Sequence, residues 1–438
     1  MTKNEQIRQS LLETREKRKS QECKVYSLKI QTNKLSKKQK ESLKMMFVEG
    51  KWFWNHIVNF TETNDIKDVD LKIKSVKHFD KDHNEVISKF NYLSSQQKSG
   101  IYKNFISNIK TLSTLKKKGK KVGRIGYISD LKSLPLVQYG NTHKIVDHNK
   151  VKIVNVGTVK AQGLKQFIYD KDVEYANANL VHTSTGYYLK ITTFKKKEEY
   201  TKPKKVIGID LGISTHITTS DGEKISVLVG ETEKLKRLQR KMQKQKKNSN
   251  NRHKTSLKIQ KEYEKMCNRK EDLANKIVHH LTDNQICVFQ DEQLHAWSGT
   301  FGKTIQHSIL GRVKAKLMKN PNAVCLNAYL PTTKLCRNCG KYHDLSLSDR
   351  TFSCECGITE DRDIHASKNM IFFYKNNIGV GRTKFKHVEI DKKISEAIQR
   401  SNQSKKHEAS TLKGRCSSHK EALKGIIQNI PKVIKRSS

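Results

Sequence analysis

Four cysteines in one short segment place the strongest constraint on how this chain can fold. They are spaced as Cys336-x2-Cys339, then fourteen residues, then Cys354-x-Cys356. Two close pairs on the arms of a hairpin can place four thiolates tetrahedrally around one Zn²⁺, with no position left open for a substrate. The spacing therefore predicts a structural zinc site.

A glycine follows each cysteine pair directly, Gly340 after the first and Gly357 after the second. Glycine adopts the backbone conformations that such tight turns require. The second pair has one intervening residue where two are usual, so we expect an unusual turn there. An alternative in which His343 replaces one cysteine stays open.

The remaining five of the nine cysteines are scattered along the chain: Cys23, Cys267, Cys287, Cys325 and Cys416. This distribution indicates a reducing compartment and a metal site, not a disulfide framework. No run of about 18 apolar residues occurs, and the N-terminus lacks the apolar core of a secretory signal. We therefore expect no membrane partner and a location in the prokaryotic cytoplasm or nucleoid.

The charge of the chain predicts a polyanionic partner. There are 87 lysines and arginines against 43 aspartates and glutamates, which gives a formal net charge of +44 in 438 residues. Self-repulsion of this size destabilises a compact state unless an anion neutralises it. Nucleic acid does so while releasing condensed counterions. A ribosomal-type protein and a membrane-surface binder are the alternatives.

The first half of the chain changes its periodicity twice. Residues 1–22 are charged and predict a mobile arm or a helix that orders on RNA. Residues 24–30 alternate like a strand, residues 60–115 are expected to be mostly helical, and residues 122–200 return to the strand period with a turn near Thr185-Gly186. A capping box and a core-facing apolar stripe precede the helical stretch: Ser36 and Gln39, then Leu43, Phe47, Trp54, Ile57 and Val58.

The second half alternates apolar strands with helical patterns, which predicts an α/β sheet of the RNase H type. Asp221-Gly222 is a hairpin turn signal between two short strands. The expected elements are the strand VIGID (206–210), a helical pair over 231–283 that turns at NSNN (248–251), the strand ICVFQ (286–290), a helix around 308–319, the strand AVCLNA (323–328) and a last helix from Asp363.

Three acids stand where such a sheet would bring them together. Asp210 ends the first strand, Glu292 lies just past the ICVFQ strand, and Asp363 begins the last helix. Asp291 competes with Glu292 for the position that faces the site. Asp361 competes with Asp363, although it can also cap the helix.

Three adjacent carboxylates cannot all ionise without a compensating cation. Two divalent ions about 4 Å apart are the natural solution, and they clamp an in-line phosphoryl displacement. Mg²⁺ suits this role because it prefers oxygen ligands and retains waters that substrate phosphates can replace. We therefore predict Asp210, Glu292 and Asp363 as catalytic ligands of two Mg²⁺ ions.

Five segments resemble the TnpB nucleases and their descendants, the miniature type V-F CRISPR effectors. They are VIGIDLGIST (206–215), FQDEQLHAW (289–297), PTTKLCRNCG (331–340), DRTFSCECG (349–357) and EDRDIHASKNM (360–370). The resemblance implies that Asp210, Glu292 and Asp363 match the three RuvC acids. Many relatives carry Asn where this chain has His365, and this departure is expected to affect metal geometry or pH dependence.

The resemblance implies an α+β multidomain protein with an RNase H-like (RuvC) α/β core, a zinc ribbon and an N-terminal wedge β-barrel with a helical recognition insertion. The expected parts are 1–35, N-terminal arm and first wedge strand; 36–121, helical recognition domain; 122–200, wedge β-barrel; 201–330, RuvC nuclease domain with the helical hairpin 231–283; 331–359, zinc ribbon that binds target nucleic acid; 360–377, helix of the third RuvC motif; and 378–438, basic C-terminal tail.

The activity that the resemblance implies is RNA-guided cleavage of DNA by two-metal-ion hydrolysis. Its partners are a guide RNA and target DNA, both double-stranded and single-stranded. Monomeric action and a homodimer on one guide RNA both stay open. So do two other functions: a guided DNA-binding repressor that does not cut, and an unguided RNase H-like nuclease or transposase, because RNase H-like folds host all of these.

Overall fold

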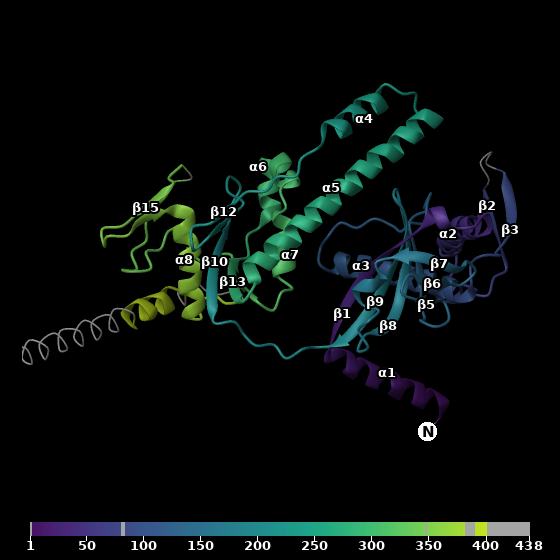
Figure 1. Ribbon diagram of the computed structural model, residues 1–438, viewed down its shortest axis with the longest axis horizontal. Helices are drawn as coiled ribbons and strands as arrows, with labels where there is room; N and C mark the ends of the chain where they lie inside the picture. The colour runs from purple at the N-terminus through teal and green to yellow at the C-terminus, as the bar shows by residue number, and fades with distance from the viewer. Residues whose placement is uncertain (1, 80–83, 347, 382–389, 401–438) are drawn as a thin grey trace, which may run out of the picture. The chain divides into compact units, whose positions relative to one another are not determined.

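The computed structural model describes residues 2–79, 84–346, 348–381 and 390–400. The chain forms two compact units, Met1–Glu199 and Tyr200–Ser438 (Figure 1). Each unit has its own buried apolar core. Within the described ranges, no helix is long and apolar enough to cross a membrane.

The first unit is built on a seven-stranded antiparallel sheet in the order β4-β8-β9-β1-β7-β6-β5. Its strands are β1 (Gln21–Ile30), β4 (Ser133–Leu136), β5 (His143–Asp147), β6 (Lys150–Ile153), β7 (Gly157–Gln162), β8 (Glu174–Thr183) and β9 (Gly186–Lys196). The pairing of Thr183 with Gly186 closes the β8–β9 hairpin and confirms the turn predicted at Thr185-Gly186. Strand β1 joins this hairpin to the β5–β7 meander, since it pairs with both β9 and β7.

This sheet is curled. The ring of Tyr139 lies 5.4 Å from the ring of His143, at the start of β5, and 5.0 Å from the ring of Tyr175, in β8. Strand β5 is one edge of the sheet, and β8 is next to β4, the opposite edge. The Tyr139 ring therefore contacts both sides of the sheet, which would lie far apart if the sheet were flat. The apolar side chains inside the curl include Leu28, Leu180 and Ile191, all fully buried.

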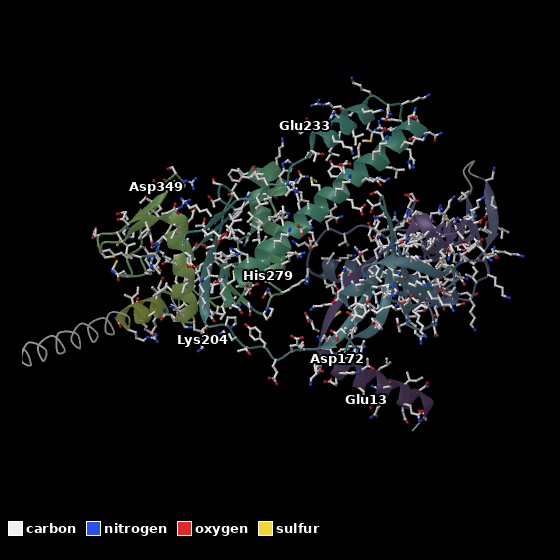
Figure 2. The ribbon with its side chains drawn as sticks, viewed as in Figure 1. Glu13, Asp172, Lys204, Glu233, His279 and Asp349 are labelled. Atoms are coloured by element: carbon white, nitrogen blue, oxygen red, sulfur yellow. The ribbon has the colours of Figure 1, made fainter. Side chains whose placement is uncertain are left out.

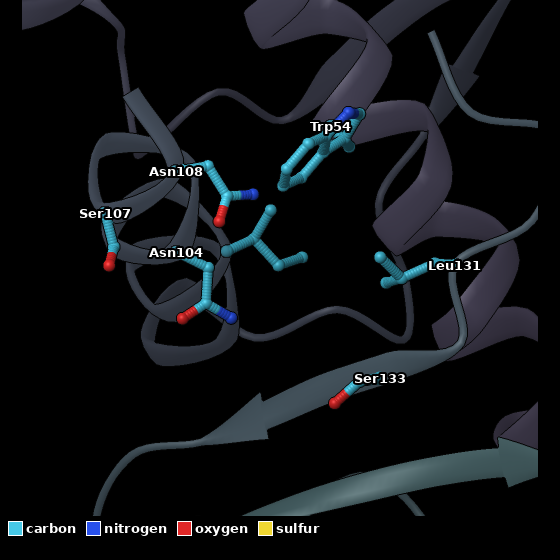
Figure 3. A pocket seen from close by; sticks show the side chains of 7 residues that line it. Trp54, Asn104, Ser107, Asn108, Leu131 and Ser133 are labelled. Atoms are coloured by element: carbon cyan, nitrogen blue, oxygen red, sulfur yellow. The ribbon is translucent and has the colours of Figure 1, made fainter. Parts of the chain in front are cut away.

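Two long helices cover this core, α2 (Lys37–Phe60) and α3 (Ser95–Lys117). The predicted capping box is present, because Ser36 accepts from the Gln39 backbone and Gln39 bonds back. The predicted apolar stripe is buried, with one half-buried member, Trp54. Figure 3 shows Trp54 at the rim of a hollow opposite Asn104 and Asn108 of α3.

The sequence prediction for the segment between these helices is wrong. Residues expected to be helical form the hairpin β2 (Ser75–Phe79) and β3 (Glu85–Lys89), preceded by the short 3-10 helix η2 (Ile66–Asp68). The two strands alternate in exposure, which is the strand period, and Val76 faces inward. The imidazole of His78 stacks on Trp52 of α2 at 4.2 Å, so a contact distant in sequence stabilises the hairpin.

Three further elements complete the first unit: α1 (Lys3–Lys19), η1 (Thr32–Lys34) and η3 (Leu164–Gln166). For residues 1–22 the sequence predicts either a mobile arm or a helix. The structure has a helix there, with a capping box between Thr2 and Glu5. Its last turn is tied to the sheet, because Arg18 and Lys17 both pair with Glu174 at 2.9 and 2.5 Å.

The second unit is built on a five-stranded sheet in the order β12-β11-β10-β13-β14. Its strands are β10 (Lys205–Leu211), β11 (Ile217–Thr219), β12 (Lys224–Ile225), β13 (Gln285–Gln290) and β14 (Ala323–Leu326). The first three strands are antiparallel neighbours, and β13 and β14 run parallel to β10. Every residue of β13 is buried, as expected of a central parallel strand covered on both faces.

Helices α5 (Asn250–Thr282) and α7 (Leu310–Leu317) pack on one face of this sheet, and α8 (Arg362–Lys375) packs on the other. Helix α4 (Glu233–Gln243) packs on α5, and α6 (Leu294–His307) contacts α7. The predicted helical hairpin is confirmed as α4 and α5, with Ser249 capping α5. Helix α6 was missed because its sequence has no sustained apolar stripe; none of its residues is buried. The short strands β15 (Thr351–Ser353) and β16 (Thr359–Asp361) form the ribbon hairpin.

Part of the predicted C-terminal tail packs into the second unit. Residues 390–400 are helical. The side chains of Ile390, Ile394 and Ala397 are buried in the same cluster as Met370 and Phe373 of α8. Residues 382–389 and 401–438 of the predicted tail lie outside the described residues.

Candidate active site

Two of the three predicted acids follow neighbouring parallel strands. Asp210 is the penultimate residue of β10, and β13 pairs with β10 in parallel with Ile209 opposite Phe289. Glu292 stands two residues after Gln290, where β13 ends. Both acids therefore lie at the carboxyl edge of the sheet, where the ends of parallel strands leave an opening.

The third acid reaches the same edge on α8, which crosses the sheet in close contact. The Ser367 hydroxyl donates to the Thr218 carbonyl of β11 and to the Asp363 carbonyl, both at 2.8 Å. Residue 208 has to be glycine because a Cβ there would lie 1.9 Å from the Ser367 carbonyl oxygen. These contacts fix the first turn of α8, and with it Asp363, over the end of β10.

The electrostatics of Asp210 show that the three carboxylates share one environment. Burial raises the pKa of Asp210 well above its ordinary value, and the negative charges of Asp363 and Glu292 raise it further. The pKa of Glu292 is also raised, first by burial, with Lys314 acting against the shift. The charges of Asp363 and Glu292 thus reach Asp210 at the carboxyl edge of the sheet.

The competing acids have other partners. Asp291 pairs with the Lys314 ammonium at 2.7 Å, and the same ammonium binds the Glu292 carbonyl oxygen. Asp361 is the N-cap of α8: its Oδ1 accepts from the backbone of Asp363 and Ile364, and its other oxygen pairs with Lys224 at 2.7 Å. Each of these acids therefore positions the element that carries a site acid.

Arg362 is a cation packed against the site. Its Nε lies 3.7 Å from Asp363 Oδ1, and its Nη1 donates to the Ser346 carbonyl at 3.1 Å. Its charge lowers the pKa of Asp210, against the larger effects of burial and the two acids. These contacts pack Arg362 between Asp363 and the Ser346 carbonyl.

The four clustered cysteines converge as predicted. One Sγ atom from each of Cys336, Cys339, Cys354 and Cys356 lies within 4.8 Å of the others. Cys336 and Cys356 are 3.4 Å apart, and Cys339 and Cys354 are 3.5 Å apart. Four sulfurs tetrahedral around Zn²⁺ at about 2.3 Å stand roughly 3.8 Å from one another, so this donor set fits zinc.

Both glycine turns are present. Gly340 and Gly357 have φ of +81° and +95°, and their amides donate to the Cys336 and Cys354 carbonyls at 2.9 Å. The hydrogen bond spans four residues in the first turn and three in the second, so the shorter pair is accommodated by a tighter turn that also uses a glycine at positive φ. His343, the alternative ligand, packs edge-on against Phe352 at 5.1 Å and is not in the sulfur cluster.

His365 joins α8 to the cysteine ribbon. Its Nδ1 lies 2.8 Å from Glu360 Oε1, its Nε2 lies 2.8 Å from the Leu335 carbonyl, and its ring stacks on Phe352 at 3.6 Å. Leu335 directly precedes the first cysteine. His365 therefore contacts the ribbon, a role that the sequence did not indicate. Its expected effect on metal geometry or pH dependence stays a prediction.

Two family models match the segments that hold these sites. The first, described as "Probable transposase", matches residues 188–292. The second, described as "Cas12f1-like, TNB domain", matches residues 313–370. These two segments of the chain are thus similar to TnpB and miniature type V-F proteins. Together they contain all three acids and all four clustered cysteines.

Individual relatives show the same similarity. A Streptomyces pristinaespiralis protein named "Putative RNA-guided DNA endonuclease" is 28% identical over 177 residues, 38% of this chain and 44% of that protein. The TnpB-like protein L79 of Acanthamoeba polyphaga mimivirus is 30% identical over 213 residues, 42% of this chain and 40% of that protein. The chain thus spans less than half the length of these curated relatives.

Among solved structures, the chain is similar to one titled "Cryo-EM structure of the Cas12f1-sgRNA-target DNA complex". The TM-score is 0.41 at 12% identity, over 76% of this chain and 80% of that chain.

Proposed function

We propose that this protein is an RNA-guided DNA endonuclease that hydrolyses target DNA in a RuvC site formed by Asp210, Glu292 and Asp363. One observation carries the proposal: two other carboxylates raise the pKa of the buried Asp210 carboxyl at the carboxyl edge of the sheet. Such a cluster is unstable without cations. Metal-dependent phosphodiesterases use carboxylate clusters of this kind to bind their metal ions.

The order of the second sheet supports an RNase H-like core. Three antiparallel strands are followed in space by two strands parallel to the first, β12-β11-β10-β13-β14, with helices on the connections. The curled seven-stranded sheet of the first unit supports the wedge barrel, and α2 and α3 support a recognition insertion. The proposed domain boundaries are those given by the sequence.

The three acids are proposed to hold two Mg²⁺ ions. When bound, this pair would supply an activated water and stabilise the leaving 3′ oxygen. The protein side of the chemistry is visible in the contacts. Lys314 holds the Asp291–Glu292 turn in place, Asp361 caps the helix that presents Asp363, and Arg362 adds positive charge beside the acids.

The four cysteines are proposed to hold one structural Zn²⁺. Four thiolate donors complete its tetrahedron, so the ion would have no catalytic position. Its role would be to fix the ribbon, which contacts α8 through His365 and Phe352. A stable ribbon would in this way hold the helix that presents Asp363.

Guide RNA and target DNA are the proposed partners. The net charge of +44 requires a polyanion, and the name of one relative specifies RNA guidance. Purifying the protein with its bound RNA and sequencing that RNA tests the first partner. The mass of the complex separates one copy per guide RNA from two.

Replacing each acid by alanine tests the nuclease proposal. Asp210→Ala, Glu292→Ala and Asp363→Ala should each abolish cleavage of a supercoiled target in Mg²⁺ while target binding survives. Asp344→Ala is the matched control, because that carboxylate is fully exposed in the ribbon. Undiminished cutting by Asp210→Ala would refute the site. A wild-type complex that binds and never cuts would indicate a repressor, and cleavage that survives ribonuclease would indicate an unguided nuclease.

A further inference from the structure

Helix α5 is far longer than the sheet it covers. It has 33 residues, and the six-residue strand β13 follows it after a two-residue turn. At 1.5 Å per helical and about 3.3 Å per strand residue, roughly 13 residues of α5 suffice to run back along β13. The buried side chains Ala274, Val278 and Leu281 lie in this part of the helix, which packs on the sheet and is called the root below. The remaining part projects beyond the carboxyl edge of the sheet (Figure 1).

The projecting part forms an arm with α4. Leu235 of α4 and Ile259 of α5 are buried, and Gln239 bonds to the Tyr263 hydroxyl at 2.9 Å. Figure 2 labels the two limits of this hairpin, Glu233 at the start of α4 and His279 near the end of α5. Because Asp210 and Glu292 follow strands that end at the same edge, the arm extends on their side of the sheet.

One face of the arm is a continuous stripe of exposed cations. It consists of Lys254, Lys258, Lys261, Lys265 and Arg269. The spacing of four, three, four and four residues puts neighbours on one face of a helix. The stripe is about 22 Å long at 1.5 Å per residue. It ends toward the root at Asp272, which pairs with Lys276 at 2.8 Å.

This stripe is unfavourable for the free helix. Each pair of like charges at three- or four-residue spacing destabilises a helix. Of the five stripe residues, Lys265 alone has an ion pair within the described part of the chain, with Glu262 at 3.1 Å, and Lys234 shares that carboxylate at 2.9 Å. Among the described residues, no carboxylate lies within ion-pair distance of Lys254, Lys258 or Lys261, nor of Arg269. A polyanion laid along this face would remove the repulsion.

We propose that this α5 stripe binds the phosphate backbone of the target DNA duplex beside the strand that is cut. The inference rests on the proposed function and adds the surface that holds the substrate. A straight, rigid row of lysines suits a rigid double helix, and lysine offers charge without the planar geometry that reads base edges. Its root in the nuclease sheet places the stripe on the side of the acids, where DNA has to lie.

The salt dependence of DNA binding tests the proposal that the stripe contacts DNA phosphates. The variant Lys254→Gln/Lys258→Gln/Lys261→Gln/Arg269→Gln is purified with its RNA, and its affinity for a matching duplex is measured from 50 to 200 mM salt. Each lost phosphate contact should flatten the plot of log K against log salt by about 0.9, so four contacts flatten it by about 3.6. Over this range the wild type should lose roughly 100-fold more affinity than the variant.

Two matched variants complete the test. The variant Lys241→Gln/Lys244→Gln/Lys246→Gln/Lys247→Gln removes the same charge from exposed positions at the far end of the arm. Its slope of log K against log salt should change by less than half as much as that of the stripe variant. Replacing the three unpaired lysines by arginine retains charge and should retain the wild-type slope. Circular dichroism verifies that the arm remains helical in each variant.

The proposal that the stripe binds DNA is refuted if both glutamine variants flatten the slope equally, because net charge alone would then explain the effect. It is equally refuted if the stripe variant loses co-purifying RNA while its DNA slope is unchanged, which would assign the face to RNA. Failure of the nuclease proposal can be distinguished from failure of the stripe proposal, because the alanine variants of the three acids test the nuclease proposal.

Discussion

Gly208 and Ser367 approach so closely that a Cβ on residue 208 would lie 1.9 Å from the Ser367 carbonyl oxygen. This contact joins β10, which carries Asp210, to α8, which carries Asp363. The separation of two candidate catalytic acids is thus set by a residue that has no side chain.

Gly208→Ala should therefore impair cleavage more than its effect on folding would suggest. Forcing the helix from the strand should lower the free energy of unfolding by about 1–3 kcal/mol and displace Asp363 from Asp210. Denaturant unfolding and cleavage assays measure the two effects. Gly311→Ala in α7 is the control, because a Cβ there meets nothing within 4 Å. Full cleavage by Gly208→Ala would show that the close approach does not set the site.

Asp210→Asn should stabilise the metal-free protein at neutral pH. A raised pKa means that the folded state holds the proton more tightly than the unfolded chain, so stability from this group is present at low pH and declines as pH rises through the folded pKa. Asparagine removes that loss, so the variant should have the higher melting temperature in the absence of metal. Melting in EDTA at pH 7 measures it. Mg²⁺ should then stabilise the wild type and leave the variant unchanged.

Cys339→Ser should abolish the stoichiometric zinc that we expect to purify with the protein. The variant would leave three sulfur donors and open the tetrahedron. Metal analysis by mass spectrometry gives the zinc content per chain. Cys267→Ser is the control, because that exposed cysteine lies on α5 outside the cluster. Equal zinc in both variants would contradict the assignment of the ligands.

His365→Ala should weaken the connection between the ribbon and α8. The ring is fully buried, stacks on Phe352 and contacts Glu360, so its removal should lower stability by about 3 kcal/mol. A double-mutant cycle with Phe352→Ala should give a coupling free energy of about 1 kcal/mol. Additive effects of the two substitutions would show that the stacked rings do not act together.

His143 should make the first unit sensitive to acid. Its imidazole is 1% exposed, and burial lowers its pKa to about 4. The unfolded chain takes up a proton near pH 6.5, so this contribution to stability is complete above that value and is lost as pH falls toward 4. Between pH 7 and pH 5 the loss should be about 2 kcal/mol.

His143→Gln should remove this dependence. Unfolding of the first unit can be followed by tryptophan fluorescence in a Trp297→Phe background, because the other two tryptophans, Trp52 and Trp54, lie on α2. The difference in pH dependence between wild type and variant isolates His143 from other titrating groups. Parallel pH profiles would show that the buried ring is not the cause.

The sequence by itself determined the features that depend on short spacing. Two cysteine pairs, each followed by glycine, predicted the sulfur cluster, because local turns alone bring each pair together. The strand VIGID ends in Asp210, and Glu292 stands two residues after the strand ICVFQ. Because parallel strands deliver their ends to one edge, the sequence could place Asp210 and Glu292 at the same edge. The capping box at Ser36 was equally local.

Only the tertiary structure decided which of two adjacent groups does what. Asp291 and Glu292 look alike in sequence, and it is the Lys314 ammonium from α7 that engages one of them. Strands β2 and β3 pair where a helix was expected, and Trp52 on another element stacks against His78 of β2. His365 contacts the ribbon because α8 and the Phe352 strand meet in space. In each case the deciding partner is distant along the chain, and a contact of that kind leaves no periodicity in the sequence.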